Sequence, residues 1–368
     1  MESATLGRAK ARVVVDALRV SAPLGDDALH FRARWADWMF HAVGGRASER
    51  ADILVAMANR IGADDLRLQA HHARWTTAFS RGQVTIGRDD IEHGLALYDL
   101  GRHREHWSMY GAHDPSVCAC ATGACTLWQA GLAERAGDLA KQAIRLGNQL
   151  GHPFSLAAAH FVGGFFAMMV GDVATADTNA QATIAVATEA NMAWPAGVGH
   201  FMAGWVIARQ GQLGRGADQM EAGFRKLQEM KQRIFLTFLG TLLANAKLEM
   251  GRTEDALNFL EELQLLSVET HQQLFIPDLH RRRAEALQRL DPKSPQIEAE
   301  YRIALQLAQE QGALALELRA AGGLATRLAA RGRTTEGAAL LRPVFDRFTE
   351  GLATPDLQAA KALLDALS

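Results

Sequence analysis

The side chains in this sequence that are best suited to chemistry are histidines and cysteines gathered between residues 93 and 120. His103 and His106 have the spacing H-x2-H, and Cys118 and Cys120 follow a short distance along the chain. Imidazole and thiolate are the ligands of tetrahedral zinc sites, so these four residues are the candidate metal ligands. The same segment has a simpler interpretation, because the Asp-Pro pair of "HDPSVC" is typical of a helix N-cap followed by proline. We favour this structural interpretation and expect neither a bound metal nor another cofactor.

A second set of histidines recurs at one place in a repeating pattern: His71, His160, His200 and His280. Stacked helices lie about 8–10 Å apart, so two of these imidazoles could share a metal, or one could bind a haem iron. Each ring could equally pack between helices and form a hydrogen bond, which is the favoured interpretation, or contact a ligand. If the chain is an enzyme, His160 and His200 are its candidate general acid or base.

The composition excludes several classes of function. The chain has 368 residues, 48% of them hydrophobic, and a formal net charge of −2, so it lacks the basic surplus of a nucleic-acid-binding protein. No uninterrupted run of 18 apolar residues predicts a membrane span, and the first 20 residues do not read as a secretory signal. Three clustered cysteines make a poor disulfide framework and indicate a cytoplasmic protein. The usual sequence signatures of P-loop, zincin and α/β-hydrolase chemistry are absent.

The elements that position these residues follow from an internal repeat. Glycine recurs after helical apolar runs at intervals of 40 residues: Gly131, Gly171, Gly211 and Gly251. Asp291 and Gly332 continue the series, and Gly82 and Gly45 precede it. Such positions predict a tight turn between two helices, where the residue must tolerate a positive φ. One hairpin alone cannot bury its apolar face, so hairpins stack. We therefore predict an all-α, right-handed α-solenoid of about eight tetratricopeptide-like hairpins with a period of about 40 residues.

The repeat also sets the domain organisation. Residues 1–368 are predicted to form a single helical-repeat domain. The interval between Gly82 and Gly131 is nine residues longer than the period, which predicts an inserted loop over residues 98–116. Residues 354–368 are predicted to form a C-terminal capping helix that begins at Thr354 and Pro355.

The segments "GLALYD", "HDPSVC", "LGHPFSLA", "GWVIARQGQ" and "DLQAAKALL" resemble the tetratricopeptide-like C-terminal region of bacterial predicted ATPases and adenylate/guanylate cyclase-associated proteins. The resemblance extends from about Ala70 to the C-terminus. It implies a helical region that senses or scaffolds. It carries over neither the ATPase nor the cyclase activity, because the residues of those domains are absent from this sequence.

The first helix of each hairpin is expected to line a concave groove. Positions −13, −10, −6 and −3 before each turn residue should face inward, which gives ten candidate ligand-binding residues: Trp128, Phe161, Phe165, Met168, Phe201, Trp205, Phe238, Asn245, Asp278 and Arg281. The middle of this groove would be aromatic and its C-terminal part polar and charged. If the face is misplaced by one position, the aromatic residues instead pack helix against helix.

These observations favour a binding or sensor module whose groove holds an apolar small molecule or an amphipathic helix of a protein partner. Neither nucleic acid nor a membrane is an expected partner. The alternative is a stand-alone enzyme on the solenoid scaffold, which would cyclise or rearrange an apolar substrate with a groove histidine as acid or base. The binding module predicts a groove open at both ends, whereas the enzyme predicts a closed cavity.

Overall fold

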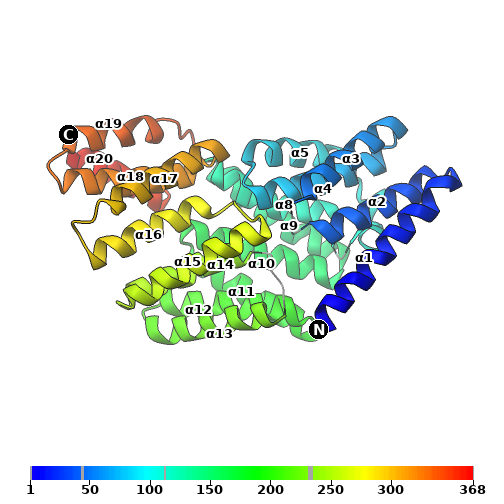
Figure 1. Cartoon of the computed structure of the whole chain (residues 1–368), viewed down its shortest axis with the longest axis horizontal. Helices are drawn as coiled ribbons and strands as arrows, with labels where there is room; N and C mark the ends of the chain where they lie inside the picture. The colour runs from blue at the N-terminus through cyan, green and yellow to red at the C-terminus, as the bar shows by residue number, and fades with distance from the viewer. Residues whose placement is uncertain (1, 43–44, 112, 231–234, 368) are drawn as a thin grey trace.

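The chain is described by a computed structural model that covers residues 2–42, 45–111, 113–230 and 235–367. Met1, Ala112 within the predicted insertion and Ser368 at the end of the predicted cap lie outside the described residues. The described part contains twenty α-helices and one short 3-10 helix, arranged as consecutive antiparallel pairs (Figure 1). The predicted all-α solenoid is therefore confirmed.

Eight hairpins follow one another in the described part of the chain. They are α2 (Asp27–His41) with α3 (Ala47–Ile61), α4 (Asp64–Arg81) with α5 (Val84–Leu97), α8 (Pro115–Gln129) with α9 (Ala133–Leu150), α10 (Pro153–Val170) with α11 (Val173–Glu189), α12 (Ala193–Arg209) with α13 (Leu213–Glu229), α14 (Leu236–Glu249) with α15 (Thr253–Thr270), α16 (Ile276–Leu290) with α17 (Gln296–Gln311), and α18 (Leu314–Ala329) with α19 (Thr334–Phe345). The first of each pair is called the A helix and the second the B helix.

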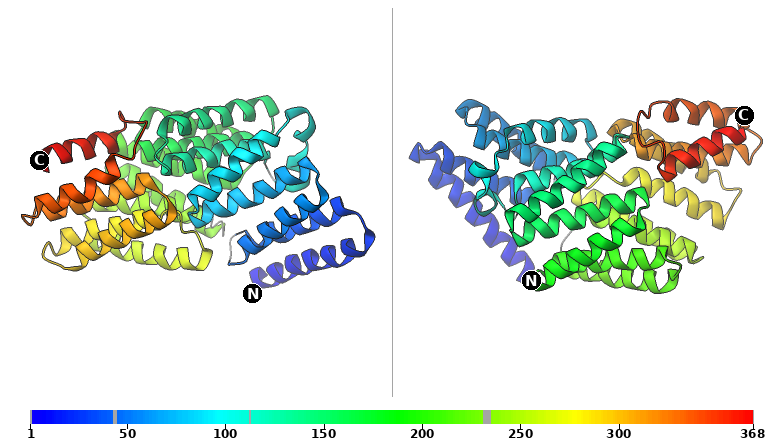
Figure 2. Two further views of the ribbon diagram at one scale, coloured as in Figure 1. Left: turned by 90° about the horizontal axis from the view of Figure 1, so that it is seen from above. Right: turned by 180° about the vertical axis from the view of Figure 1, so that it is seen from behind.

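The remaining helices flank or interrupt this series. α1 (Glu2–Ser21) and η1 (Ala22–Leu24) precede the first hairpin, and α20 (Pro355–Leu367) packs on α18 and α19 at the C-terminal end. The predicted insertion contains two short helices, α6 (Leu100–His103) and α7 (His106–Tyr110). Two further views show the hairpins curving into a short superhelix with the N- and C-terminal helices at different ends (Figure 2).

The turn glycines have the conformation that the repeat predicts. Gly131, Gly171, Gly211 and Gly251 have φ between 76° and 92°, a region that residues with a Cβ rarely adopt. Small residues just after the turns let the helices approach: a Cβ built on Gly216 of α13 would lie 2.4 Å from the backbone nitrogen of Ala208 in α12. Asp291 is an exception to the prediction, because its φ is −138° and the connection from α16 to α17 is longer.

The superhelix curves tightly enough for distant hairpins to touch across its axis. The Gln273 N–H, before α16, donates to the Ser80 carbonyl at the end of α4 over 2.8 Å. Phe235, at the start of α14, packs edge-on against Phe79 of α4 and against Phe161 and Phe165 of α10. The axis in this middle part is consequently filled by side chains.

Helix α10 crosses the centre of this packing. It is long and apolar enough to span a membrane by length and composition, with a mean hydropathy of 1.6 over 18 residues, although the sequence reading predicted no such segment. In the structure, 67% of that stretch is buried among other helices, which is the usual setting of a core helix.

Candidate functional site

A cleft of about 510 Å³ lies between the A helices of five consecutive hairpins and the C-terminal helix α20. Met168, Trp205 and Leu242 supply apolar surface from α10, α12 and α14. The α18 wall is partly bare backbone at Gly322 and Gly323, and α20 closes the remaining side. A recess of this size suits a drug-sized molecule or a few residues of a peptide.

Four arginines line this cleft: Arg209, Arg281, Arg282 and Arg319. The same lining contains two carboxylates, those of Glu285 and Asp356. The lining is therefore basic, although the whole chain has a net charge of −2. Each guanidinium also has a partner within the protein, which holds it in place. Arg209 lies 2.6 Å from Glu249 and over the Trp205 ring, and Arg319 lies 2.8 Å from Asp356.

The base of the cleft is a buried cluster on α16 that we call the arginine cluster: Asp278, Arg281, Arg282 and Glu285. Arg281 bridges both carboxylates at 2.6 Å and 2.5 Å, and Arg282 lies 2.9 Å from Glu285. Burial alone would raise the pKa of Asp278 and of Glu285, but the two guanidinium charges outweigh it and lower both pKa values. The cluster is therefore fully ionised at neutral pH.

One donor of this cluster, the Nε of Arg282, makes no hydrogen bond among the described residues, although it lies 3.8 Å from the Asp278 carboxylate. The Arg282 Nε atom is buried and has no hydrogen-bond partner, while its Nη1 contacts Asn245 and Glu285. A buried N–H without an acceptor costs about 1–3 kcal/mol. An anionic group entering the cleft would remove that cost.

The ten predicted ligand-binding residues fall into three groups. Four of them, Met168, Trp205, Asn245 and Arg281, line the cleft. Asp278 lies behind the cleft as the partner of Arg281. The other five are buried in the main hydrophobic core, to which Met168 and Trp205 also belong: Trp128, Phe161, Phe165, Phe201 and Phe238.

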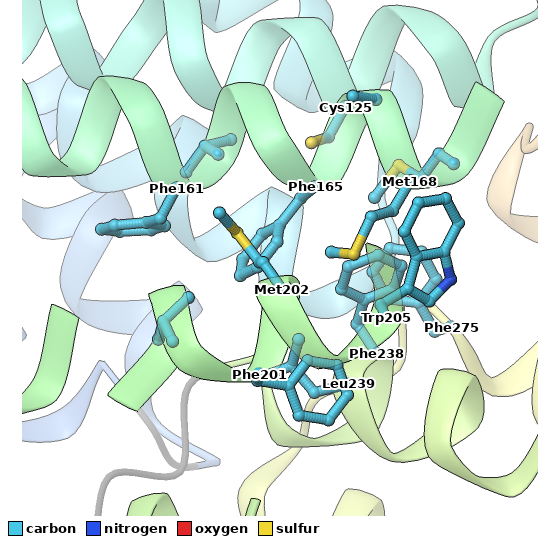
Figure 3. Packing of buried hydrophobic residues seen from close by; sticks show 14 of the residues in the cluster. Cys125, Phe161, Phe165, Met168, Phe201, Met202, Trp205, Phe238, Leu239 and Phe275 are labelled. Carbon is cyan, nitrogen blue, oxygen red and sulfur yellow. The ribbon is translucent and has the colours of Figure 1, made fainter. Parts of the chain in front are cut away.

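Those five fill the part of the groove that the sequence reading expected to be open. Phe165 packs edge-on against Phe235 and Phe238, with ring centroids 5.1 Å and 5.2 Å apart. The Phe238 ring packs at a tilt against Phe275, with centroids 4.6 Å apart. Figure 3 shows Met168 and Trp205 together at one side of this aromatic packing and Phe161 at the other. The groove is therefore not open at both ends, since its middle is core.

The sequence reading missed several residues of the cleft. Arg319, Gly322 and Thr326 line it from α18. They stand 13, 10 and 6 residues before Gly332, so the same positional rule extended to the last hairpin would have found them. Arg209 and Asp356 have no comparable signal, because their place depends on how α12 and α20 meet other repeats.

The metal candidates separate into two neighbouring clusters of possible ligands. His103 and His106 lie with Asp65 of α4, whereas Cys118 lies with His72 of α4 and His113. In each cluster, one potential ligand atom per residue lies within 4.8 Å of the others. Cys120 belongs to neither cluster, and burial raises its pKa to about 12.

Gln69 of α4 connects the two clusters, which together we call the histidine network. Its Nε2 donates to His106 Nδ1 over 2.9 Å, and its Oε1 lies 3.2 Å from His72 Nδ1. Burial lowers the pKa of His72, and lowers those of His106 and His113 to about 4, so these rings are neutral at pH 7. The predicted N-cap is confirmed beside them, because the Asp114 carboxylate accepts from the N–H groups of Ser116 and Val117.

The recurring histidines mostly partner the B helix of their own hairpin. His71 lies 2.7 Å from Asp90, His160 3.0 Å from Asn179, and His280 2.7 Å from Glu300. None of the four belongs to the two metal-like clusters found among the described residues.

His200 differs from the other three because it is exposed at the surface. Neither His160 nor His200, the candidate acid–base residues, lines the cleft.

No protein-family model matches the chain. Among curated proteins, the chain is 26% identical over 319 residues to an uncharacterized protein of Rhizobium meliloti (strain 1021). The matched stretch covers 84% of this chain but 30% of that relative, so the chain spans about a third of its length.

Solved structures with a similar arrangement share little sequence with the chain. A Rap protein complexed with competence and sporulation factor superposes with a TM-score of 0.63 at 13% identity, over 100% of this chain and 97% of that one. The tetratricopeptide-repeat sensor protein of the STAND class from Pyrococcus horikoshii gives a TM-score of 0.43 at 11% identity, over 98% of this chain and 55% of that one. The chain therefore has a tetratricopeptide-like solenoid fold.

Proposed function

We propose that this chain is a protein-binding sensor module that holds a short acidic segment of a partner polypeptide in the cleft. The observation that carries the proposal is the lining itself, which joins an apolar surface at Met168, Trp205 and Leu242 to four arginines. An apolar side chain of the partner would pack on Trp205. A neighbouring carboxylate would accept from the unpartnered Nε of Arg282.

The size of the cleft narrows the sequence-based expectation of an apolar small molecule or an amphipathic helix. A volume of about 510 Å³ is close to that of a single helical turn, about 5.4 Å long and 10–12 Å across, so the cleft accommodates a few residues and not a long helix. The Rap structure that shares the fold was determined in complex with competence and sporulation factor, which supports a binding role for this fold. The resemblance of the sequence to the helical regions of ATPase- and cyclase-associated proteins supports a sensor role.

The alternative of an enzyme built on the solenoid receives no support from the two candidate histidines. The His160 ring is held by Asn179, and the His200 ring is exposed on a different surface from the cleft. We therefore propose no reaction at either residue.

A peptide-binding experiment tests the proposal. Fluorescein-labelled hexapeptides with one large apolar residue and two Asp or Glu residues are titrated with the full chain, and anisotropy is recorded. A matched set carries Lys in place of the acids. We expect the acidic set to bind and the basic set not to bind, with affinity that falls as salt rises. Equal binding of both sets, or of neither, would contradict the proposal.

Two variants assign the binding to the cleft. Arg209→Gln and Arg282→Gln each remove one lining charge and should weaken binding about tenfold, because a charge-assisted hydrogen bond contributes about 1.5–3 kcal/mol. Arg302→Gln is the matched control, since Arg302 is half-exposed on the B helix α17 and does not line the cleft. Affinity that drops equally in all three variants would place the site elsewhere.

A further inference from the structure

The histidine network holds a second possible site, separate from the cleft. His72 in the middle of α4, His113 just before α8 and Cys118 in the first turns of α8 bring three potential ligand atoms within 4.8 Å of one another. The Cys118 and His72 side chains are 7% and 2% exposed. Trp75 Nε1 donates to Cys118 Sγ over 3.5 Å and its ring stacks on His72, so the surroundings are largely apolar.

The hydrogen bonds of Gln69 decide which nitrogen of His72 carries a proton. The amide nitrogen of Gln69 donates to His106 Nδ1, so the amide oxygen faces His72 Nδ1 and must accept from it. His72 is then protonated at Nδ1, and its Nε2 lone pair is left for Cys118, with which the ring shares a hydrogen bond. A carbonyl that accepts from the other ring nitrogen is the usual support of a metal-bound histidine.

His113 supplies an independent observation. Its Nε2 atom is buried and has no hydrogen-bond partner in the described structure. The ring is fixed in place between His72, at a centroid distance of 5.3 Å, and Phe154, at 6.1 Å. A buried ring nitrogen without a partner is costly unless something else occupies its lone pair.

The neighbouring cluster of Asp65, His103 and His106 lacks these features. His103 Nδ1 accepts from the Asp99 N–H over 2.8 Å, so its Nε2 carries the proton and donates to Asp65 over 3.0 Å. His106 accepts at Nδ1 from Gln69 and is therefore protonated at Nε2. Neither His103 nor His106 therefore has a free ring-nitrogen lone pair for a metal ion. The hydrogen bonds of that cluster explain why its side chains lie together.

We propose that His72, His113 and Cys118 bind one zinc ion, with a water molecule as the fourth ligand. His72 and His113 would each donate a ring-nitrogen lone pair, and Cys118 would lose its thiol proton to solvent and bind as thiolate. Tetrahedral zinc places its ligand atoms roughly 3.5 Å apart, so the three side chains must close by on the order of 1 Å. Zinc would tie the insertion of residues 98–116 to α4 and α8, and the open fourth position would leave room for an exogenous ligand.

Cobalt(II) serves as the spectroscopic probe, because it takes the same ligands as zinc and reports a bound thiolate by an intense near-ultraviolet charge-transfer band. The full chain is stripped with a chelator, dialysed, and titrated with CoCl₂ and separately with ZnCl₂. We expect one equivalent of Co²⁺ to produce the band and one equivalent of Zn²⁺ to abolish it. A wild-type chain that shows no such band, or binds less than one ion per chain, overturns the proposal without reference to any variant.

Matched variants assign the ligands. Cys118→Ser should lose the charge-transfer band, and His113→Ala should reduce the bound metal from one ion per chain to background. Cys120→Ser and His200→Asn are the controls, because Cys120 lies two residues along the same helix and His200 is exposed on α12, outside the histidine network. Each variant is checked by circular dichroism and its unfolding curve. A band that survives in Cys118→Ser, or that is lost equally in Cys120→Ser and His200→Asn, overturns the assignment.

Discussion

The histidine network near the insertion and the arginine cluster below the cleft are both clusters of polar side chains packed between helices, yet they are stabilised in opposite ways. The histidine network is held by neutral rings and one shared amide, Gln69. The arginine cluster is held by full charges, with two guanidinium groups against two carboxylates. The first should therefore respond to mild acid, and the second to the removal of a single charge.

This difference in charge also explains which kind of ligand each of the two clusters can bind. Neutral imidazoles suit a metal ion, because the ion can bind a ring nitrogen without first displacing a proton from it. Fixed guanidinium groups suit an anion, and they face the cleft because α14, α18 and α20 leave that side of α16 uncovered. Two kinds of site thus arise in different repeats of the same solenoid.

The largest expected effect is in the arginine cluster. Asp278→Ala would leave Arg281 and Arg282 with Glu285 alone, in a place where Asp278 is 7% exposed. Removal of one partner of a buried ion pair costs about 3–5 kcal/mol, so the urea midpoint should fall sharply. Asp365→Ala is the control, because the Asp365–Lys361 pair on α20 is exposed and should contribute less than about 1 kcal/mol. Similar losses in the two variants would show that the arginine cluster behaves as a surface network.

An intermediate effect is expected from mild acid on the histidine network. Burial holds the pKa of His106 at about 4, against 6.5 in an unfolded chain. Between these values the unfolded chain binds a proton that the folded chain does not, so stability falls as the pH is lowered. From pH 7 to pH 5 the loss at this residue should be roughly 1–2 kcal/mol. Urea unfolding at several pH values should therefore give a flatter dependence for His106→Asn than for the wild type.

The arginine cluster should add nothing to that slope. The pKa values of Asp278 and Glu285 are lowered in the folded state, so their stabilisation is present above the unfolded carboxyl pKa of about 4 and is lost only below it. His200→Asn serves as the control variant, since its ring is exposed. If His106→Asn leaves the pH dependence of the unfolding free energy unchanged, protonation of the histidine network does not destabilise the fold. The expected contrast with the arginine cluster would then be wrong.

The sequence could predict the features that depend on local geometry. The 40-residue spacing of Gly131, Gly171, Gly211 and Gly251 predicted the hairpin turns, because each turn needs a positive φ and a helix of nearly fixed length on either side. The inward positions of the A helices followed from the same register, which is why Met168, Trp205, Asn245 and Arg281 line one cleft.

The features that depend on the angle between repeats could not be predicted in this way. Phe235 fills the axis only because α4 and α14 meet across it, and nothing in either segment alone indicates that meeting. His72 escaped notice beside the recurring His71, because its partners His113 and Cys118 arrive from a later repeat. Asp291 was expected to behave as a turn glycine, but its connection is longer and needs no positive φ.

The smallest expected effect concerns the recurring histidines. His160 forms one neutral hydrogen bond, to Asn179 on its own hairpin, and belongs to neither buried polar region. His160→Ala should therefore lower stability by only about 0.5–1.5 kcal/mol in urea unfolding, and should leave acidic-peptide affinity unchanged because the ring lies outside the cleft. His200→Ala, in the next repeat, is exposed and should change stability by less than about 0.5 kcal/mol. A tenfold loss of peptide affinity in His160→Ala would move the binding surface from the cleft to the α10–α11 hairpin and would end the assignment of binding to the arginine cluster.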